Sequence, residues 1–287
     1  MFIGAHVSVA RGLSSAVEYA ASVGCETVQV FAKSPRRWEG PPTDADSGRR
    51  FAEAREAAGI ASAFTHTAYL INLASPDDML WERSVAALAD EITRGRLLAT
   101  DGVATHLGTH PSGESDVAAD RIAAGILRAF ELAGGDEASE TRLLLENTAG
   151  GGTTYGRSVA AIGAVLDRCG TLRPLLGVCL DTCHAHAAGI DLRDENAWGS
   201  ALAEVESECG SEAIGLIHAN DCMFELGSHR DRHAWIGEGT MGSEAFSAML
   251  RRPELARVSI VTEMPGEIPD KDRENIRRLK ALRDDVM

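Results

Sequence analysis

The chain has 287 residues, of which 44% are hydrophobic and 25% charged, as in globular proteins that bury a full core. Its formal net charge of −15 argues against a generic nucleic-acid binder, which usually carries a basic excess, and fits a protein that holds several cations. The apolar runs are far shorter than the roughly 20 residues of a membrane span, and the N-terminus lacks the basic and apolar regions of a signal peptide.

Apolar segments of strand length alternate along the chain with segments of helical spacing. The expected strands cover residues 2–6, 27–31, 61–66, 102–106, 142–147, 175–181, 213–218 and 257–263. The expected helices cover residues 12–23, 46–58, 77–99, 116–134, 158–169, 195–209, 243–250 and 270–283. The strands show little alternation, as in a parallel sheet that is buried on both faces. We therefore expect an α/β fold, a single (β/α)8 TIM barrel domain over residues 1–287, with a doubly wound open sheet as the alternative.

Seven of the eight expected strands end at a side chain that could bind a metal or transfer a proton. These residues are His6, His66, His106, Glu146, Asp181, His218 and Glu263. In a (β/α)8 barrel the C-terminal ends of the strands form one rim, where active sites lie. One histidine there would be read as structural, but seven converging ionisable groups need cations to compensate them. The mixture of imidazoles and carboxylates suits zinc or manganese better than calcium.

Polar residues in the loops extend this set. His184 follows Asp181 by three residues, which predicts a turn that places the imidazole beside the carboxylate. Asp231 and His233 are two residues apart and would lie on one side of an extended segment, although alone they would be read as a solvated loop. His6 and Asp221 are expected to support the ligands, with Asp221 orienting a ligating imidazole.

A basic loop follows the second expected strand. It contains Lys33, Arg36 and Arg37, with Trp38 next to them. On the barrel rim these cations could contact phosphates, and a long side chain could insert into a base stack. An ordinary surface loop is the alternative.

The segment after the third expected strand is apolar for a rim loop. Tyr69 and Leu70 could wedge into stacked bases if they are exposed. Ile71 and Leu73 are instead expected to pack against the following helix. The six cysteines are sparse and form no CxxC pair, so we expect reduced thiols that do not bind the metals.

Taken together, these segments resemble endonuclease IV, the metal-dependent apurinic/apyrimidinic (AP) endonuclease family of the xylose-isomerase-like barrels, over nearly the whole chain. The most specific motifs are Glu-Asn-Thr-Ala-Gly at 146–150 and Asp-Thr-Cys-His at 181–184. The other matching segments are 4–8 (Gly-Ala-His-Val-Ser), 69–73 (Tyr-Leu-Ile-Asn-Leu), 106–110 (His-Leu-Gly-Thr-His), 231–233 (Asp-Arg-His), 237–239 (Gly-Glu-Gly) and Glu263.

The resemblance implies three zinc ions, with manganese as an alternative at one site. The first zinc would take His66, His106 and Glu146; the second would share Glu146 and add Asp181, His218 and Glu263; the third would take His184, Asp231 and His233. Glu146 would be catalytic, because it could bridge two metals and position or deprotonate the attacking water. Arg36, Tyr69 and Leu70 would enter the DNA at the lesion.

The activity implied is hydrolysis of the phosphodiester bond 5′ to an abasic site in duplex DNA, leaving 3′-hydroxyl and 5′-deoxyribose phosphate ends. The strongly acidic chain would then need a local basic crescent, formed by Lys33, Arg36, Arg37, Arg230 and Arg232. We expect a monomer with no membrane contact that works in the cytoplasm and associates with the nucleoid while acting. The alternatives are a sugar isomerase or epimerase, which rarely needs a third metal cluster, and a damaged-DNA binder that does not cut.

Overall fold

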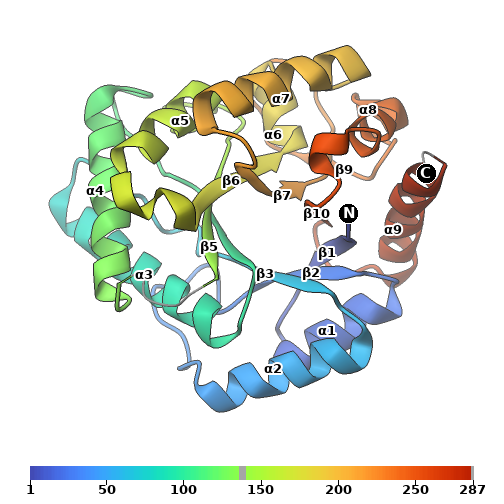
Figure 1. The fold of residues 1–287 in the computed structure, drawn as a ribbon, viewed down its shortest axis with the longest axis horizontal. Coiled ribbons are helices and arrows are strands. Elements are labelled where there is room, and N and C mark those ends of the chain that lie inside the picture. The colour runs from blue at the N-terminus through green and yellow to red at the C-terminus, as the bar shows by residue number, and fades with distance from the viewer. Residues whose placement is uncertain (136–139, 286–287) are drawn as a thin grey trace.

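Eight parallel strands close into a barrel in the computed structural model, which describes residues 1–135 and 140–285. Their order around the barrel is β1-β10-β7-β6-β5-β4-β3-β2 (Figure 1). The strands are β1 (Ile3–Val7), β2 (Thr27–Phe31), β3 (Ser62–His66), β4 (Gly102–Thr105), β5 (Arg142–Glu146), β6 (Leu176–Asp181), β7 (Ile214–His218) and β10 (Ser259–Thr262). The expected barrel is confirmed, and the open doubly wound sheet is wrong.

Helices surround the strands and join most of them in parallel crossovers (Figure 1). They are α1 (Leu13–Ser22), α2 (Ala45–Ala58), α3 (Asp78–Leu97), α4 (Asp116–Leu132), α5 (Val159–Arg168), α6 (Thr182–Ala188), α7 (Glu195–Cys209), α8 (Gly242–Leu250) and α9 (Pro269–Asp284). Short 3₁₀ turns, η1 (Gly170–Leu175) and η2 (Pro253–Leu255), precede β6 and β10, and β8 (Asp221–Cys222) pairs with β9 (His233–Ala234) in a small ribbon. None of the helices in the described ranges has the length and hydropathy of a membrane span.

Side-chain caps explain where several of these helices begin. Asp44, Asp77, Ser115, Ser158 and Asp194 each accept the backbone N–H three residues further along the chain. Such caps satisfy one of the donors that a helix N-terminus leaves free. Because each helix starts soon after a rim loop, the caps also fix the positions at which those loops end.

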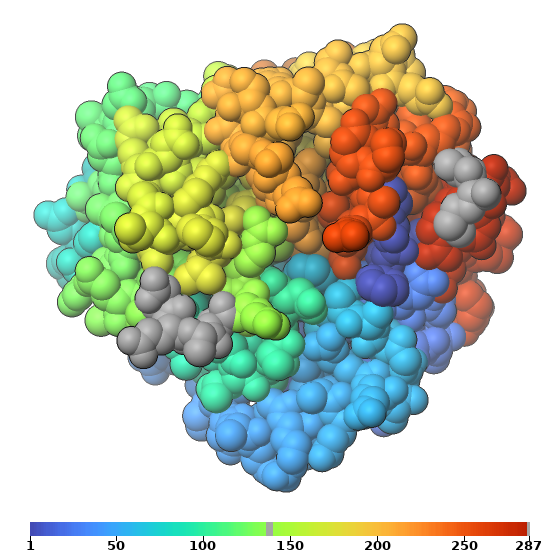
Figure 2. Space-filling view, in the orientation of Figure 1, coloured from blue at the N-terminus to red at the C-terminus, as the bar shows by residue number. Residues whose placement is uncertain are grey.

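The barrel closes where the two ends of the chain meet. Strand β1 pairs with β10, and the Met1 ammonium group donates to the carbonyl of Ala256 at 2.7 Å. The blue N-terminal residues accordingly lie against the orange-red segment in the space-filling view (Figure 2). This closure brings residues near both ends of the sequence, such as His6 and Glu263, to one rim.

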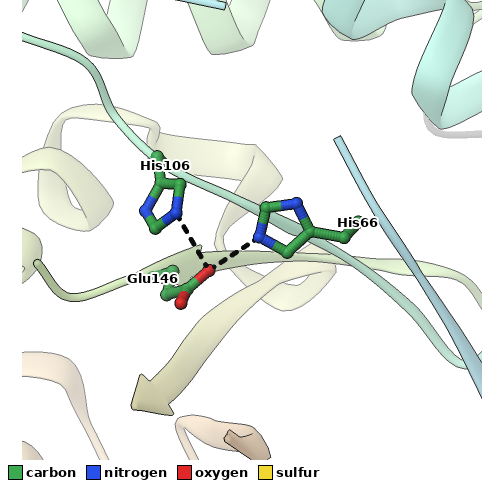
Figure 3. A group of neighbouring side chains, drawn as sticks. All are labelled: His66, His106 and Glu146. Atoms are coloured by element: carbon green, nitrogen blue, oxygen red, sulfur yellow. Dashed lines mark hydrogen bonds and ion pairs between the residues drawn. The ribbon is translucent and has the colours of Figure 1, made fainter. Parts of the chain in front are cut away.

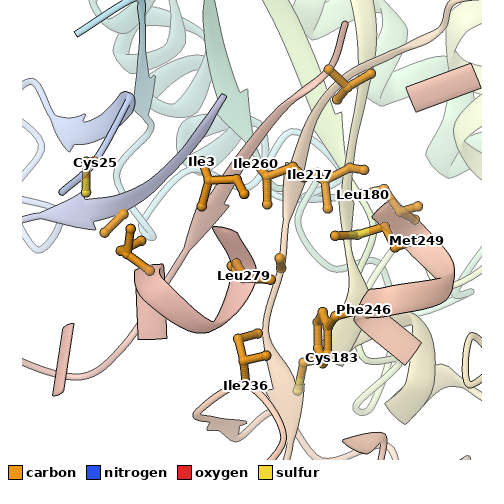
Figure 4. Close-up of a cluster of buried hydrophobic side chains, with 14 of the residues drawn as sticks. Ile3, Cys25, Leu180, Cys183, Ile217, Ile236, Phe246, Met249, Ile260 and Leu279 are labelled. Atoms are coloured by element: carbon orange, nitrogen blue, oxygen red, sulfur yellow. The ribbon is translucent and has the colours of Figure 1, made fainter. Parts of the chain in front are cut away.

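The apolar core has two layers. Between the strands and the outer helices, residues such as Ile217 and Ile260 pack against Phe246, Met249 and Leu279 of α8 and α9 (Figure 4). Strand neighbours of these residues point to the opposite face and fill the barrel interior. That inner cluster consists of Phe64, Ala104, Leu144, Cys179, Leu216 and Val261. The polar rim therefore rests on a filled core rather than on an open channel.

Candidate metal centre

The first group of potential ligands joins three neighbouring strands. His66 ends β3, Glu146 ends β5, and His106 directly follows β4. The Nε2 atom of His66 lies 2.9 Å from Oε2 of Glu146, and Nε2 of His106 lies 3.7 Å from the same oxygen (Figure 3). His66 and Glu146 are almost completely buried, and His106 is partly exposed. The three predicted ligands of the first metal therefore converge.

The second group shares Glu146 with the first. Ligand atoms of Glu146, Asp181, His218 and Glu263 all lie within 4.8 Å of one another. The Nδ1 atom of His218 is 3.1 Å from Oε1 of Glu146 and 3.2 Å from Oε2 of Glu263. The two Glu146 oxygens thus face different imidazoles, as a bridging carboxylate requires.

The third group depends on the residues that follow β6. Asp181 caps α6 by accepting the N–H of His184 at 2.7 Å, so the predicted turn is the first turn of a short helix. This places Nε2 of His184 at 3.3 Å from Oδ2 of Asp231. The Nε2 atom of His233 lies 3.4 Å from Asp231 and 3.6 Å from Asp181. Asp181 therefore joins the second group to the third.

In three of the histidines a hydrogen bond at Nδ1 leaves the other ring nitrogen, Nε2, free to bind a metal in one of the three groups. The Nδ1 atoms of His66, His184 and His233 donate to the backbone carbonyls of Thr67, Asn147 and Glu263, at 2.8, 3.0 and 2.8 Å. Metal-bound histidines usually carry such a bond, which fixes the tautomer and the orientation of the ring.

An imidazole lone pair and a carboxylate that face each other repel unless a cation lies between them. The separations of 3.3 to 3.7 Å between the imidazoles of His106, His184 and His233 and the nearest carboxylates are longer than charge-assisted hydrogen bonds. They are close to the edge of about 3.3 Å expected for a tetrahedron with zinc–ligand bonds of about 2.0–2.1 Å. In addition, Nε2 of His233 is buried without a hydrogen-bond partner among the described residues. The residues present therefore fit divalent metal ions.

His218 uses the opposite tautomer, and Gln29 is the reason. The Nε2–H of His218 donates to the Gln29 side-chain oxygen at 2.9 Å, which leaves Nδ1 for the second group. The Gln29 amide in turn donates to Glu263 at 2.9 Å. Sequence reasoning missed this residue, although a glutamine inside the apolar strand Thr27–Phe31 was a usable signal.

Two asparagines that were not assigned a role also hold the ligands in place. Asn147 pairs with the backbone of Asp181 through both its side-chain oxygen and its amide. The Asn220 amide donates to the Asp181 carboxylate at 2.7 Å, and its oxygen accepts the N–H of Glu263. Both lie in polar runs directly after strand ends, which is the signal that could have identified them.

The electrostatics of Glu146 favour the charged carboxylate. Burial alone would raise the pKa of Glu146, but with no metal bound, positive charge on His106 and His218 and hydrogen bonds from His184 and His218 hold that pKa well below its ordinary value. Bound cations would take the place of the protons on these imidazoles. A carboxylate that stays ionised is suited to binding cations, whereas a protonated one is not.

The two predicted supporting residues, His6 and Asp221, make different contacts. His6 contacts the Glu263 carboxylate at 3.0 Å, as a group that holds a ligand in place would. Among the described residues, Asp221 makes no hydrogen bond to any of the imidazoles that face the ligand groups. Its carboxylate accepts backbone N–H groups of Cys222, Gly237, Gly239, Met241 and Gly242, so it shapes the 237–242 turn instead.

The cysteines near the centre are buried thiols. All six cysteines are free, as expected, and buried. Cys179 lies in range of Glu146 and His218, and Cys183 lies in range of Asp181 and His233. Because a thiolate is the form that binds metal, and burial raises the pKa of Cys179 to about 12, the histidines and carboxylates are the better donors.

The two loops predicted to touch DNA lie on the rim beside the first group. Arg36 and Arg37 are exposed, Tyr69 is 62% exposed, and Leu70 is partly exposed. The Tyr69 ring lies 5.9 Å from the His66 ring, centre to centre. As predicted, the next apolar residues of this loop, Ile71 and Leu73, are buried.

Lys33 departs from the prediction. Its side chain is fully buried and pairs with Asp90 at 2.5 Å and with Glu91 at 3.5 Å, so it does not reach the surface to contact phosphate. The expected basic crescent is therefore reduced to exposed arginines. Of these, Arg230 lies over the Phe224 ring at 3.6 Å, and Arg232 donates to the carbonyl of Asp231.

Comparisons with known proteins agree with this geometry. Residues 17–282 match the family described as xylose isomerase-like TIM barrel. A probable endonuclease 4 from Methanoculleus marisnigri is 38% identical over 282 residues, which cover 98% of this chain and 99% of that protein. The chain belongs to the endonuclease IV family. The crystal structure of endonuclease IV from Thermus thermophilus superimposes with a TM-score of 0.86 at 34% identity, covering 99% of this chain and 100% of that one.

Membership of the endonuclease IV family confirms the resemblance predicted from the motifs. A D-tagatose 3-epimerase-like protein also superimposes, with a TM-score of 0.75, but at 19% identity it shares the barrel alone. The relatives of this family are named as endonucleases, whereas the epimerase-like protein is similar in fold only.

Proposed function

We propose that the chain is a DNA-repair endonuclease that hydrolyses the phosphodiester bond 5′ to AP sites in duplex DNA, leaving 3′-hydroxyl and 5′-deoxyribose phosphate ends. The observation that carries this proposal is the third group, in which His184, Asp231 and His233 meet beside two groups that share Glu146. Sugar isomerases and epimerases on this barrel need the two carboxylate-bridged metals but rarely a third.

Three zinc ions would occupy the three groups, with manganese as an alternative at one of them. When bound, such ions polarise phosphate oxygens, lower the pKa of bound water and stabilise charge on a leaving oxygen. Seven of the nine ligands lie at strand ends or within three residues of them, and the remaining two belong to the loop segment that ends in β9. The barrel strands therefore determine the positions of most of the donors.

Among the side chains, Glu146 would have the main role in the proposed hydrolysis. Its two oxygens face separate imidazoles, so it can bridge two cations and offset their repulsion. We further propose that Glu146 positions the attacking water or accepts a proton from it. The bond between phosphorus and the 3′-oxygen of the preceding nucleotide would break. That nucleotide would keep the oxygen as a 3′-hydroxyl, which a polymerase can extend.

Selectivity for an abasic site would come from the rim loops. Tyr69 and Leu70 could fill the space that a missing base leaves, while Arg36 contacts the backbone. Turning the baseless sugar out of the helix costs little, because its pairing is already lost. We further propose that the protein works as a monomer formed by one barrel domain over residues 1–287. A cytoplasmic location, with nucleoid association during action, stays a prediction.

The proposal is tested by Glu146→Gln, with Glu204→Gln on the exposed face of α7 as the matched control. The Glu146→Gln protein should lose cleavage of an abasic duplex, by about a thousandfold or more, while it keeps most of its DNA affinity. The control should cleave as the wild type does. Normal turnover by Glu146→Gln would contradict the assignment.

A further inference from the structure

We propose that one polar stripe of helix α3, centred on Glu91, positions both rim loops that carry the proposed DNA-contacting side chains. Glu91 would be a positioning residue, acting through the loops and touching neither DNA nor metal. This inference rests on the function proposed above and adds to it the element that sets the geometry of lesion recognition.

The stripe consists of Arg83, Asp90, Glu91 and Arg94, spaced so that they lie along one side of α3. The loop 33–43 begins at Lys33, whose buried ammonium group lies between Asp90 and Glu91. The loop packs closely at this point, because a Cβ atom on Gly40 would lie 2.7 Å from the Cβ of Lys33. The first attachment of the loop is therefore a buried lysine that pairs with one buried and one partly exposed carboxylate.

The same helix holds the middle and the end of this loop. The Arg83 guanidinium lies over the Trp38 ring at 4.5 Å. Arg94 donates to the carbonyl of Pro41 at 2.8 Å and to the hydroxyl of Thr43 at 2.9 Å. Arg94 also donates to Asp90, which joins this attachment to the one at Lys33. Contacts with α3 therefore hold residues 34–40, which include Arg36, at both ends and at Trp38.

Glu91 links this loop to the second one. Its Oε1 atom faces Lys33 and also accepts the backbone N–H of Ala68 at 3.3 Å, directly before Tyr69. The loops touch as well, since the N–H of Tyr69 donates to the carbonyl of Pro35 at 3.1 Å. One carboxylate oxygen therefore sets the position of both loops relative to each other.

The burial of Glu91 does not stabilise the fold by itself. Glu91 is 1% exposed, and its Oε2 atom has no hydrogen-bond partner within the described ranges. Burial raises the pKa of Glu91 to about 7 in spite of Lys33. A buried charge with one oxygen unsatisfied is a poor source of stability. The contribution of Glu91 is therefore to loop geometry, and loss of its charge should separate recognition from stability.

The experiment compares zinc-loaded wild type with Glu91→Gln and Glu91→Met, using Glu82→Gln on the exposed side of α3 as the control. Glutamine keeps an oxygen for the Ala68 N–H but loses the ion pair with Lys33, whereas methionine loses both at similar volume. The KM for an abasic duplex should rise about threefold in Glu91→Gln and about tenfold in Glu91→Met, with kcat within about twofold of wild type. The amides of residues 34–40 and 68–70 should exchange hydrogen faster in both variants.

Several results would overturn the inference. The first is that both Glu91 variants have the same KM and the same hydrogen-exchange rates in the two loops as the Glu82→Gln control. The second is that the Glu91 variants lose kcat while their KM stays unchanged. If Glu91→Met does not fold, Glu91→Gln alone decides the question by the same criteria. If the wild type does not cut abasic DNA, the proposed function fails, while hydrogen exchange of the two loops still tests the positioning role.

Discussion

Replacing Glu91 with glutamine should stabilise the fold at neutral and alkaline pH, although it loosens the rim loops. The groups that face Glu91 are Lys33 and the backbone N–H of Ala68, with Asp90 and Arg94 on its own helix. None of them outweighs burial, which raises the pKa of Glu91 from 4.5 to about 7. Glutamine resembles the protonated acid in shape and avoids the buried charge.

The sign and size follow from proton linkage. Because the pKa of Glu91 is higher in the folded state, the folded protein binds more protons than the unfolded chain between pH 4.5 and about 7. Stability that comes from protonated Glu91 is therefore present below pH 4.5 and is lost as the pH rises through 7. The full loss corresponds to about 3 kcal/mol. Glu91→Gln should match wild type near pH 4 and exceed it by up to about 3 kcal/mol at pH 8.

Urea unfolding of wild type, Glu91→Gln and Glu82→Gln between pH 4 and pH 9 measures this difference. The metal ligands are the same in all three proteins, so loss of metal at low pH cancels when the variants are compared. Glu82 is exposed, so its replacement should change little across the range. A difference that does not vary with pH, or a Glu91→Gln protein less stable than wild type at pH 8, would refute the reasoning.

Three further predictions concern the metals, the DNA and the core. Asp231→Asn should lower the zinc content by about one ion per chain, because Asp231 belongs to the third group. Mass spectrometry of the metals after gel filtration measures this content, and an unchanged value would rule out the third site. In a plot of log affinity for abasic DNA against log salt concentration, Arg36→Ala should reduce the magnitude of the slope by about one, as measured by fluorescence anisotropy. An unchanged slope would show that Arg36 does not contact a phosphate. Leu73→Ala should lower the free energy of unfolding by about 2–5 kcal/mol because the side chain is completely buried, and a loss under about 1 kcal/mol in urea unfolding would contradict that packing.

The strands and the polar residues at their C-terminal ends were predictable from sequence because both depend on local pattern. An apolar run that stops at a polar residue defines a strand and its end together, so His66, Glu146 and Asp181 were found at the C-termini of β3, β5 and β6. Even so, β1 runs one residue past His6 to Val7. The helix α6 was expected as a turn, because the capping bond that the His184 N–H donates to the Asp181 carboxylate is not visible in so short a segment.

What the sequence did not reveal depends on partners far along the chain. Lys33 was expected to face DNA, but its partner Asp90 lies 57 residues away, and charge alone does not tell whether a lysine is exposed. Asp221 lies beside a ligand in sequence, yet its carboxylate is used by the 237–242 turn. Gln29 supports His218 from 189 residues away. Such contacts exist only once the barrel has closed.

The proposed activity is tested most sharply by incubating the protein with a duplex that contains one abasic-site analogue, before and after its metals are removed by chelation. The metal-loaded protein should nick the strand on the 5′ side of the lesion and leave a 3′ end that a polymerase extends. The stripped protein should not nick it, and added zinc should restore cleavage. Binding of the abasic duplex without cleavage by the zinc-loaded protein would contradict the proposed function and identify a damaged-DNA binder instead.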